Sequence, residues 1–535
     1  MKRIFGGTIR KLVALTVALA MALGMVGGAV AEENTKTVNI AVTGTIGSLN
    51  PLLMGATEVL KYANSLVFLP LVELNSDLEF VPQLAESITT EDNLTFTIKL
   101  QDAATWSDGT PVTSKDVAFT LLCLASPESF NAGMAMYAIE GTDDAGMVES
   151  GATEISGVKI VDDKTLTVTT KWPIALYTFE NNYGRYVLTL PEHILGQVDK
   201  AELLTYDWFN NADVISGPYY VKDFDLNHYV HYEANPDYWM GEAKIKYLNI
   251  NVLESAQLLS GLQSGEIDLV QQTMGNILLE DYDSVRALPN VTVHMGTPIT
   301  NQSIFFNVER VTDVRIRQAL LYGIDRQTIL SELVHGNGEI VDGFLCSASP
   351  YYDASLGVTP YDPEKAAQLI QEAVADGASN RLEWYVNSGD ATFVQAASFI
   401  AAMFQELGLT IDIKTVDLNT LMDVANNGTF DVMSVEYTYA PVDPYTDVSW
   451  LLSTDGWTRY SNEEVNNALV ESQSLTDVEE IRARYLLVDQ YMQQDVPMMS
   501  AYIISSMGAT SNRLLNATPN VFGTFINVNE WDIAE

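Results

Sequence analysis

Hydrophobic and polar positions alternate along several short segments in the first third of the chain. Thr37–Thr43 (TVNIAVT) alternates in this way, and the turn-rich stretch 44–51 follows it. The same period of two returns over Leu94–Leu100 and Thr165–Thr170, with turn residues between them. Such alternation is typical of strands with one buried face. It predicts a first strand that enters a surface loop, followed by a mostly antiparallel β subdomain with few helices.

The pattern changes after Tyr247, where strand-like and helix-like segments alternate. A strand over Tyr247–Val252, a helix over Ser255–Gln263 and a strand over Ile267–Val270 predict one crossover unit. Further segments predict a helix after Asp362 that stops at Gly377, a strand over Leu382–Val386, a helix over Thr392–Leu407, strands over Leu409–Val416 and Phe430–Val435, a helix over 478–494 and a strand over Met498–Ile504. This alternation indicates an α/β lobe with a largely parallel sheet, and the tail after it looks irregular.

The first 31 residues have the pattern of a secretory signal. Lys2 and Arg3 begin a basic segment, an apolar run covers Leu12–Val30, and Ala29-Val30-Ala31 offers a small-x-small cleavage site. An uncleaved membrane anchor is the alternative, because the apolar run is nearly long enough to span a bilayer. No cysteine follows the run, so we expect no lipid anchor. The protein is expected at the periplasm or the extracellular face of the cell envelope.

The net charge and the cysteine content exclude some binding partners and one class of fold. The 535 residues include 70 Asp and Glu against 28 Lys and Arg, a formal net charge of −42, which disfavours nucleic acid. Only two cysteines are present, too few for a disulfide scaffold. Cys123 lies in an apolar helical run, and we expect Cys123 and Cys346 to be buried thiols, with a disulfide as the alternative.

The sequence contains no recognisable catalytic motif. G-x-S-x-G, H-E-x-x-H and P-loop patterns are absent. His228 and His231 have the spacing of some metal pairs, but their segment alternates like a strand, which would point them to opposite faces. We therefore expect no metal site, no cofactor and no catalytic residue. Aromatic residues are frequent near predicted strand ends, from Trp384 to Trp457, where they favour either a ligand pocket or core packing.

Several motifs resemble those of one known family. They are Phe68-Leu69-Pro70-Leu71-Val72-Glu73-Leu74, Pro82-Gln83-Leu84-Ala85-Glu86-Ser87, Trp106-Ser107-Asp108-Gly109-Thr110-Pro111, Ser216-Gly217-Pro218-Tyr219-Tyr220, Asn235-Pro236-Asp237-Tyr238-Trp239, Gly261-Leu262-Gln263-Ser264-Gly265 and Asp313-Val314-Arg315-Ile316-Arg317. In this order they resemble the extracellular solute-binding protein family 5, the dipeptide- and oligopeptide-binding proteins of ABC importers. We interpret Trp106, Asp108 and Gly109 as a structural turn, despite their diagnostic value.

The resemblance implies an α/β fold of the two-lobed periplasmic-binding-protein type II, with an extra β-rich subdomain in the first lobe. By analogy, lobe I comprises 32–75, 183–297 and 506–535, the extra subdomain 76–182, and lobe II 298–505, after a signal peptide at 1–31. Such a protein is not an enzyme. It captures a solute between its lobes and delivers it to a membrane permease, and we expect it to act as a monomer.

The resemblance also suggests where a ligand would bind. Members that bind peptides hold the ligand's ammonium with an aspartate three residues before an Asp-Pro pair, and Ala440 stands at that position here. A buried ammonium without a counter-charge is costly. Peptide is nevertheless the default cargo that the family implies, with an oligosaccharide or a nickel chelate as alternative cargoes. A secreted hydrolase or an extracellular chaperone is a more distant alternative function. The expected ligand-binding residues are Tyr437, Tyr439, Trp384, Asn387, Asp443, Gly47, Ser48 and Asn50, with Asp443 equally suited to a structural loop cap. Replacing Tyr437 by alanine should weaken ligand binding and leave the fold intact.

Overall fold

A computed structural model describes residues 35–535, apart from residues 56, 132, 133, 135, 390, 439, 440 and 535. The expected signal peptide lies outside the described residues, and so do Tyr439 and Ala440. Within the described part of the chain, no helix is both long and apolar enough to cross a membrane.

The first lobe is built on a seven-stranded sheet whose strands come from distant parts of the chain. β1 lies inside the sheet and pairs in parallel with β10 on one side and β11 on the other, while the outer strands pair antiparallel. The spatial order is β12 (Val291–Met295), β19 (Met507–Ser511), β11 (Leu269–Val270), β1 (Thr37–Val42), β10 (Tyr247–Val252), β9 (Tyr229–Ala234) and β8 (Tyr219–Asp225).

The predicted crossover unit is confirmed, because α7 (Ser255–Ser264) connects β10 to β11 and ends at Gly265, which adopts a left-handed conformation. The prediction of an irregular tail was wrong. Residues 507–511 form β19, which is hydrogen-bonded between β11 and β12, and two further short strands, β20 (Leu514–Leu515) and β21 (Asp532–Ile533), pair with each other.

The extra subdomain contains a separate four-stranded sheet with the order β4-β5-β7-β6. Every pairing in it is antiparallel, as predicted. Its buried residues Phe96, Trp106 and Val168 belong to the same hydrophobic cluster as Ile40 and Ile250 of the large sheet, so it packs on the first lobe. The strands are β4 (Ala85–Thr90), β5 (Thr95–Leu100), β6 (Val158–Asp162) and β7 (Thr165–Thr169), beside α3 (Ser114–Ala125) and the hairpin of β2 (Val72–Leu74) and β3 (Phe80–Pro82).

The motif Trp106 to Thr110 forms a tight turn, in keeping with its structural interpretation. The Gly109 N–H donates to the Trp106 carbonyl over 2.9 Å, and the Asp108 carboxylate accepts from the Thr110 N–H at the same distance. Gly109 has a φ of +85°, a conformation that is readily adopted by glycine. Other short helices of this half include α2 (Glu58–Ser65), α4 (Leu176–Phe179), the π-helix η4 (Glu180–Arg185), α5 (Glu192–Leu195), α6 (Lys200–Leu203) and α8 (Tyr282–Arg286).

The second lobe is built on a six-stranded sheet with the order β14-β18-β13-β17-β15-β16. The sheet is mixed, which corrects the prediction of a largely parallel one: β15 pairs in parallel with β16 and β17, whereas β13, β14, β17 and β18 pair antiparallel. The strands are β13 (Thr300–Phe306), β14 (Gly338–Glu339), β15 (Arg381–Asn387), β16 (Thr410–Val416), β17 (Val432–Thr438) and β18 (Met498–Ile504).

Helices cover both faces of this sheet and bury two hydrophobic clusters, one containing Trp384 and Phe404 and the other Phe344 and Tyr485. Asp362 caps the helix after it as predicted, since its side chain accepts from the Lys365 N–H. The helices are α9 (Val314–Gly323), α10 (Arg326–Glu332), α11 (Pro363–Ala375), α12 (Ala391–Glu406), α13 (Leu418–Asn426), α14 (Tyr445–Leu451), α15 (Glu463–Ser472) and α16 (Val478–Asp495).

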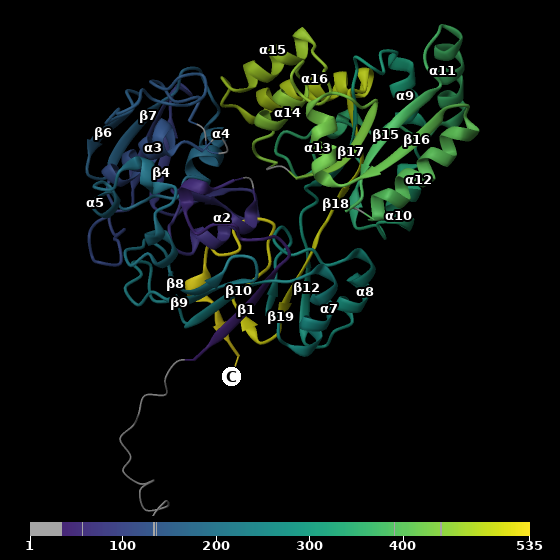
Figure 1. Cartoon of the computed structure of the whole chain (residues 1–535). Coiled ribbons are helices and arrows are strands. Elements are labelled where there is room, and N and C mark those ends of the chain that lie inside the picture. The colour runs from purple at the N-terminus through teal and green to yellow at the C-terminus, as the bar shows by residue number, and fades with distance from the viewer. Residues whose placement is uncertain are drawn as a thin grey trace, which may run out of the picture. The chain divides into compact units, whose positions relative to one another are not determined.

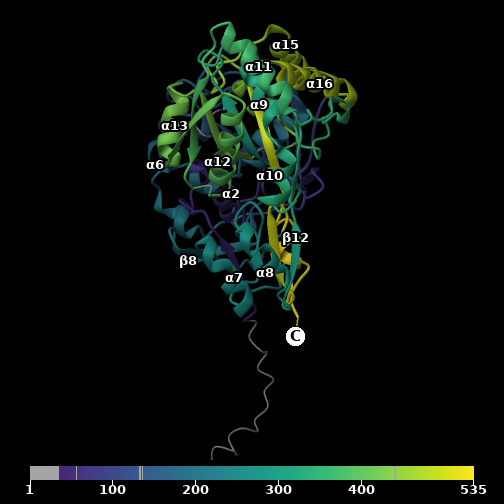
Figure 2. The same cartoon turned by 90° about the vertical axis from the view of Figure 1, so that its right-hand side faces the viewer.

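Two chain segments run side by side from one sheet to the other. Residues 296–299 join β12 to β13, and residues 505–506 join β18 to β19, a passage that Figures 1 and 2 both show. The Gly296 N–H donates to the Ser506 carbonyl over 2.9 Å. In short paired connections of this kind, changes in the backbone torsions of a few residues are enough for a hinge motion of the two lobes. The expected lobe boundaries at 297 and 505 fall in or beside these connections and stay a prediction.

Candidate functional site

A cavity of about 740 Å³ lies between the two lobes. This volume is within the usual range for small-ligand sites. The first lobe contributes the loop after β1, the start of α2, the end of η4, the segment from Gln272 to Tyr282, and Phe522. The second lobe contributes strand ends and loops at Thr300, Asn387, Gly389, Thr392, Glu436, Thr438, Tyr502 and Ile504. A solute held here would contact both lobes.

The sheet topology explains why polar groups gather on the second-lobe side of the cavity. β15 and β17 are parallel neighbours, so their carboxyl ends lie at the same edge of the sheet. Asn387 at the end of β15 and Thr438 at the end of β17 both line the cavity. Crevices at the carboxyl ends of parallel strands are frequent ligand sites in α/β proteins.

On the first-lobe side, the segment after β11 is fixed to the loop after β1. The Thr43 N–H donates to the Met274 carbonyl over 2.9 Å. The Thr273 hydroxyl donates to the Val521 carbonyl over 3.0 Å, which ties the same segment to the returning tail. These hydrogen bonds fix the irregular segment after β11, with its backbone groups and small polar side chains, against the cavity.

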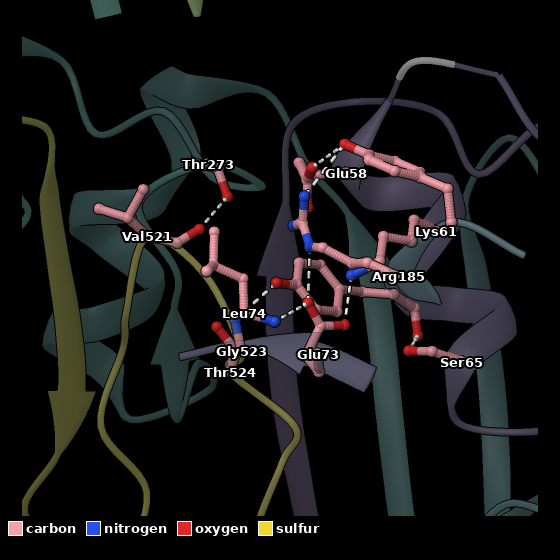
Figure 3. A network of polar contacts seen from close by, with 12 residues as sticks. Glu58, Lys61, Ser65, Glu73, Leu74, Arg185, Thr273, Val521, Gly523 and Thr524 are labelled. Atoms are coloured by element: carbon pink, nitrogen blue, oxygen red, sulfur yellow. Dashed lines mark hydrogen bonds and ion pairs between the residues drawn. The ribbon is translucent and has the colours of Figure 1, made fainter. Parts of the chain in front are cut away.

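A buried network of charges supports the cavity floor (Figure 3). Glu73 lies between two cations: Arg185 Nε donates to its Oε1 over 2.7 Å, and the Lys61 ammonium forms an ion pair with its Oε2. Arg185 Nη2 also donates to Glu58 over 2.9 Å, and the Tyr186 hydroxyl donates to the other Glu58 oxygen over 2.7 Å. Two anions thus balance two cations in the interior.

Burial and charge act against each other in this network. Burial raises the pKa of Glu73, but the charges of Lys61 and Arg185 outweigh it and hold that pKa below its ordinary value. Burial, assisted by the charge of Arg185, lowers the pKa of Lys61 to about 8. Burial alone would lower the pKa of Arg185, yet Glu58, Tyr186 and Glu73 raise it well above its ordinary value. Arg185 therefore keeps its charge.

Arg185 and Glu58 line the cavity, yet the guanidinium is nearly inaccessible. The Arg185 side chain is 1% exposed, whereas that of Glu58 is 16% exposed. The guanidinium carbon also lies 4.9 Å from the ring centroids of both Tyr186 and Phe522, an aromatic environment that favours a cation. Arg185 is thus a structural support for the cavity wall rather than an open anion site.

The expected residues of the first loop do not line the cavity; their neighbours Thr43 and Gly44 do. Gly47 forms the turn with a φ of +77°. The Ser48 hydroxyl accepts from the Asn50 N–H over 3.0 Å, and the buried Asn50 side chain accepts from the Leu52 N–H and donates to the Leu203 carbonyl. The side chains of Ser48 and Asn50 thus bond to backbone groups and shape the loop, and Gly47 provides its turn.

Trp384 also lies away from the cavity lining. Its side chain is fully buried, its Nε1 donates to the Ser434 hydroxyl over 2.8 Å, and its ring packs against Phe393. Tyr437 is half-buried and donates its hydroxyl to Asp447 over 2.7 Å, with its ring beside Trp457. Of the eight expected site residues, Asn387 lines the cavity, and Tyr439 lies outside the described residues.

Asp443 forms a second contact between the halves of the molecule. It is 2% exposed, and its carboxylate accepts from the Thr178 hydroxyl over 2.8 Å and from the Asn181 side-chain amide over 3.3 Å. Thr178 and Asn181 belong to α4 and η4, at the end of the range expected for the extra subdomain. Burial raises the pKa of Asp443 to about 6, with a further contribution from the charge of Asp447. Asp443 therefore joins the lobes across a polar interface.

The cysteines and the paired histidines have the following surroundings. Both cysteines are buried thiols, as predicted. His228 Nδ1 lies 2.9 Å from Asp225 Oδ2, within hydrogen-bond distance, and His231 stacks on the Tyr229 ring with centroids 4.3 Å apart. Among residues 35–535, outside the positions left undescribed, no group of three His, Cys, Asp or Glu side chains is placed to hold a metal ion.

The comparisons with known proteins now decide the family. The model for "Bacterial extracellular solute-binding proteins, family 5 Middle" matches residues 79–459. The chain belongs to this family. It is accordingly a solute-binding protein and not an enzyme.

Three relatives illustrate the range of this family. A protein of Brucella ovis named for peptide binding in an ABC transporter is 29% identical over 77% of this chain and 73% of its own length. The nickel-binding periplasmic protein of Escherichia coli is 24% identical over 76% of each chain. The structure of the oligopeptide-binding protein AppA from Bacillus subtilis, in complex with a nonapeptide, superposes with a TM-score of 0.73 at 22% identity, covering 94% of this chain and all of AppA. The last comparison shows the two-lobed fold.

Sequence reasoning missed most of the first-lobe wall of the cavity. Glu58 and Arg185 carry no local signal, because they are brought together by pairings with Glu73 and Tyr186. The segment after β11 did offer one. Gln271, Gln272 and Thr273 come directly after a short buried strand, and polar residues in that place are typical of a loop that lines a crevice.

Proposed function

We propose that this protein is the solute receptor of an ABC importer, that its cargo is a peptide, and that it hands the cargo to a membrane permease. The observation that supports this function most directly is the inter-lobe cavity, which is lined by both lobes, in a molecule whose two sheets are joined by two paired connections. A solute that contacts both walls favours the closed arrangement, and opening of the hinge releases it.

Peptide is favoured over a nickel chelate by the lining of the cavity. Its described residues include no histidine and no cysteine, and they include amide and hydroxyl side chains at strand ends, such as Asn387 and Thr438. Such groups suit the amides of a peptide backbone. Relatives named for peptide or oligopeptide binding support the same cargo.

The place of action is also proposed. The basic and apolar N-terminal segment supports export by a cleaved signal, and relatives are named as periplasmic. We propose that the protein acts as a monomer outside the cytoplasm. The net charge of −42 also argues against a nucleic-acid partner.

A thermal-shift screen tests the cargo. Peptide mixtures, oligosaccharides and nickel chelates are added separately to the purified protein, since a ligand that binds only the native state raises the melting temperature. A shift with peptides alone supports the proposal. A rise in melting temperature with only sugars or nickel chelates contradicts the peptide cargo. The nickel experiment is repeated with an added chelator, to distinguish binding of the free metal ion from binding of the chelate.

A further inference from the structure

Among the residues that the structure describes, the charged groups that a solute could reach in the cavity are all acidic. Three glutamates line it, Glu58, Glu280 and Glu436, and the side chains of the last two are exposed. Among the described lining residues, Arg185 alone is basic. Its side chain is 1% exposed and its guanidinium is already bound to Glu58 and Glu73, so it offers a solute no accessible positive charge.

The acidic groups face the cavity from both lobes. Glu280 belongs to the segment before α8 in the first lobe, and Glu436 lies on β17 in the second. The charge of Glu436 reaches Tyr282 of α8, where it adds to the effect of burial in raising the pKa of the tyrosine hydroxyl. A cation held between the lobes would thus meet negative charge on both sides when they close.

A buried acceptor without a donor adds an independent observation. Gln272 lines the same cavity and is 6% exposed. Its side-chain amide donates to the Pro519 and His294 carbonyls, but its Oε1 accepts no hydrogen bond from the described residues. A buried oxygen in this state is costly, and a ligand rich in N–H groups could satisfy it.

Nearby basic groups do not reverse this picture. Arg286 packs on the Tyr282 ring, but it pairs with Asp283 and donates to Asn337 Oδ1 over 3.0 Å, and it does not line the cavity. An anionic solute would therefore lose its hydration without gaining a counter-charge from the described lining.

We propose that the cavity selects cationic cargo, namely peptides with basic side chains, and that Glu280 and Glu436 are the residues that set this preference. The inference rests on the proposed function and names its substrate class. The acidity of the whole chain acts in the same direction, because it attracts cations to the cavity mouth.

Calorimetry with three matched peptides tests the preference. Ala-Lys-Lys-Ala should bind at least about tenfold more tightly than Ala-Gln-Gln-Ala, a difference of ~1.4 kcal/mol, and Ala-Glu-Glu-Ala should bind most weakly. The order should compress at high salt, which screens exposed charges. Equal affinities for all three peptides, or tighter binding of the acidic one, would overturn the proposal.

Paired variants locate the preference. Glu280→Gln with Glu436→Gln should reduce the lysine preference severalfold and leave the affinity for Ala-Gln-Gln-Ala nearly unchanged. Glu309→Gln removes an acid that is also exposed but lies outside the cavity lining, and it serves as the control. A preference that survives the double variant, or falls equally in the control, refutes the assignment of these residues.

A non-peptide cation separates this inference from the peptide cargo. Spermidine carries positive charge and no peptide backbone. If no peptide binds but spermidine does, and the double variant abolishes that binding, the charge preference stands and the peptide cargo fails. If peptides bind without regard to charge, the cargo stands and the charge preference fails. If neither peptides nor spermidine bind, both are refuted.

Discussion

Replacing Glu73 by glutamine should destabilise the protein strongly, because it removes the anion that holds two buried cations. The Glu73 side chain is 6% exposed, and its partners Lys61 and Arg185 are 0% and 1% exposed. After the change Arg185 keeps Glu58, but Lys61 loses its ion pair. Breaking a buried pair from one side typically costs about 3–5 kcal/mol.

The size of the effect can be read by calorimetry at neutral pH. Unfolding entropy is about 2.1 cal/mol/K per residue, so for a chain of this length 1 kcal/mol corresponds to roughly 1 °C, and Glu73→Gln should lower the melting temperature by about 3–5 °C. The matched control is Glu86→Gln, which breaks an exposed pair with Lys99 and should cost less than about 1 kcal/mol.

A double-mutant cycle tests the reasoning itself. Lys61→Met combined with Glu73→Gln removes the orphaned ammonium together with its anion, so the double variant should cost clearly less than the sum of the single ones, by about 1–3 kcal/mol. If the two costs simply add, or if Glu73→Gln is as mild as Glu86→Gln, the network does not stabilise the fold as argued.

Three further predictions concern other buried groups. Burial raises the pKa of Asp489 to about 7, so the folded state holds the carboxyl proton more tightly than the unfolded state, and stability is lost as pH rises from about 4 to 7. Asp489→Asn should remove on the order of 4 kcal/mol of this loss and give a flatter plot of melting temperature against pH. An unchanged slope would contradict this prediction. Thr178→Val removes a hydroxyl that donates to Asp443, and should cost about 1–3 kcal/mol at pH 8 but less at pH 5, where Asp443 is protonated; equal costs at both pH values would refute this. Burial raises the pKa of Cys123 to about 12, and Cys346 is likewise fully buried. Neither cysteine should therefore react with a disulfide reagent in the native protein, and both should react after denaturation; rapid native reaction, or none after denaturation, would show the assignment to be wrong.

Local pattern was a reliable guide where it was strong. β18 has the predicted bounds, and α12 and β16 differ from their predicted bounds by about one residue, because long apolar runs and glycine stops define them. β19 was missed because MGATS has no strand-like alternation; it is buried on both faces and pairs with strands more than 200 residues earlier. The direction of the strands in the second sheet likewise depends on pairings between segments that are far apart in the sequence, so a short stretch of sequence does not determine it.

The site shows the same limit. Asn387 could be predicted because it follows a strand, whereas Arg185 and Glu58 acquire their position from a network that spans more than 100 residues. Trp384 illustrates a signal that was available: on β15 the alternating residues Leu382, Trp384 and Val386 are all buried, so the period of two already placed the indole in the core.

Small-angle scattering with and without a saturating peptide tests the central claim most directly, since that claim is the capture of a solute between two lobes joined by a hinge. A peptide that raises the melting temperature should also reduce the radius of gyration, as the lobes close on it. Tight peptide binding with an unchanged scattering profile would contradict the account.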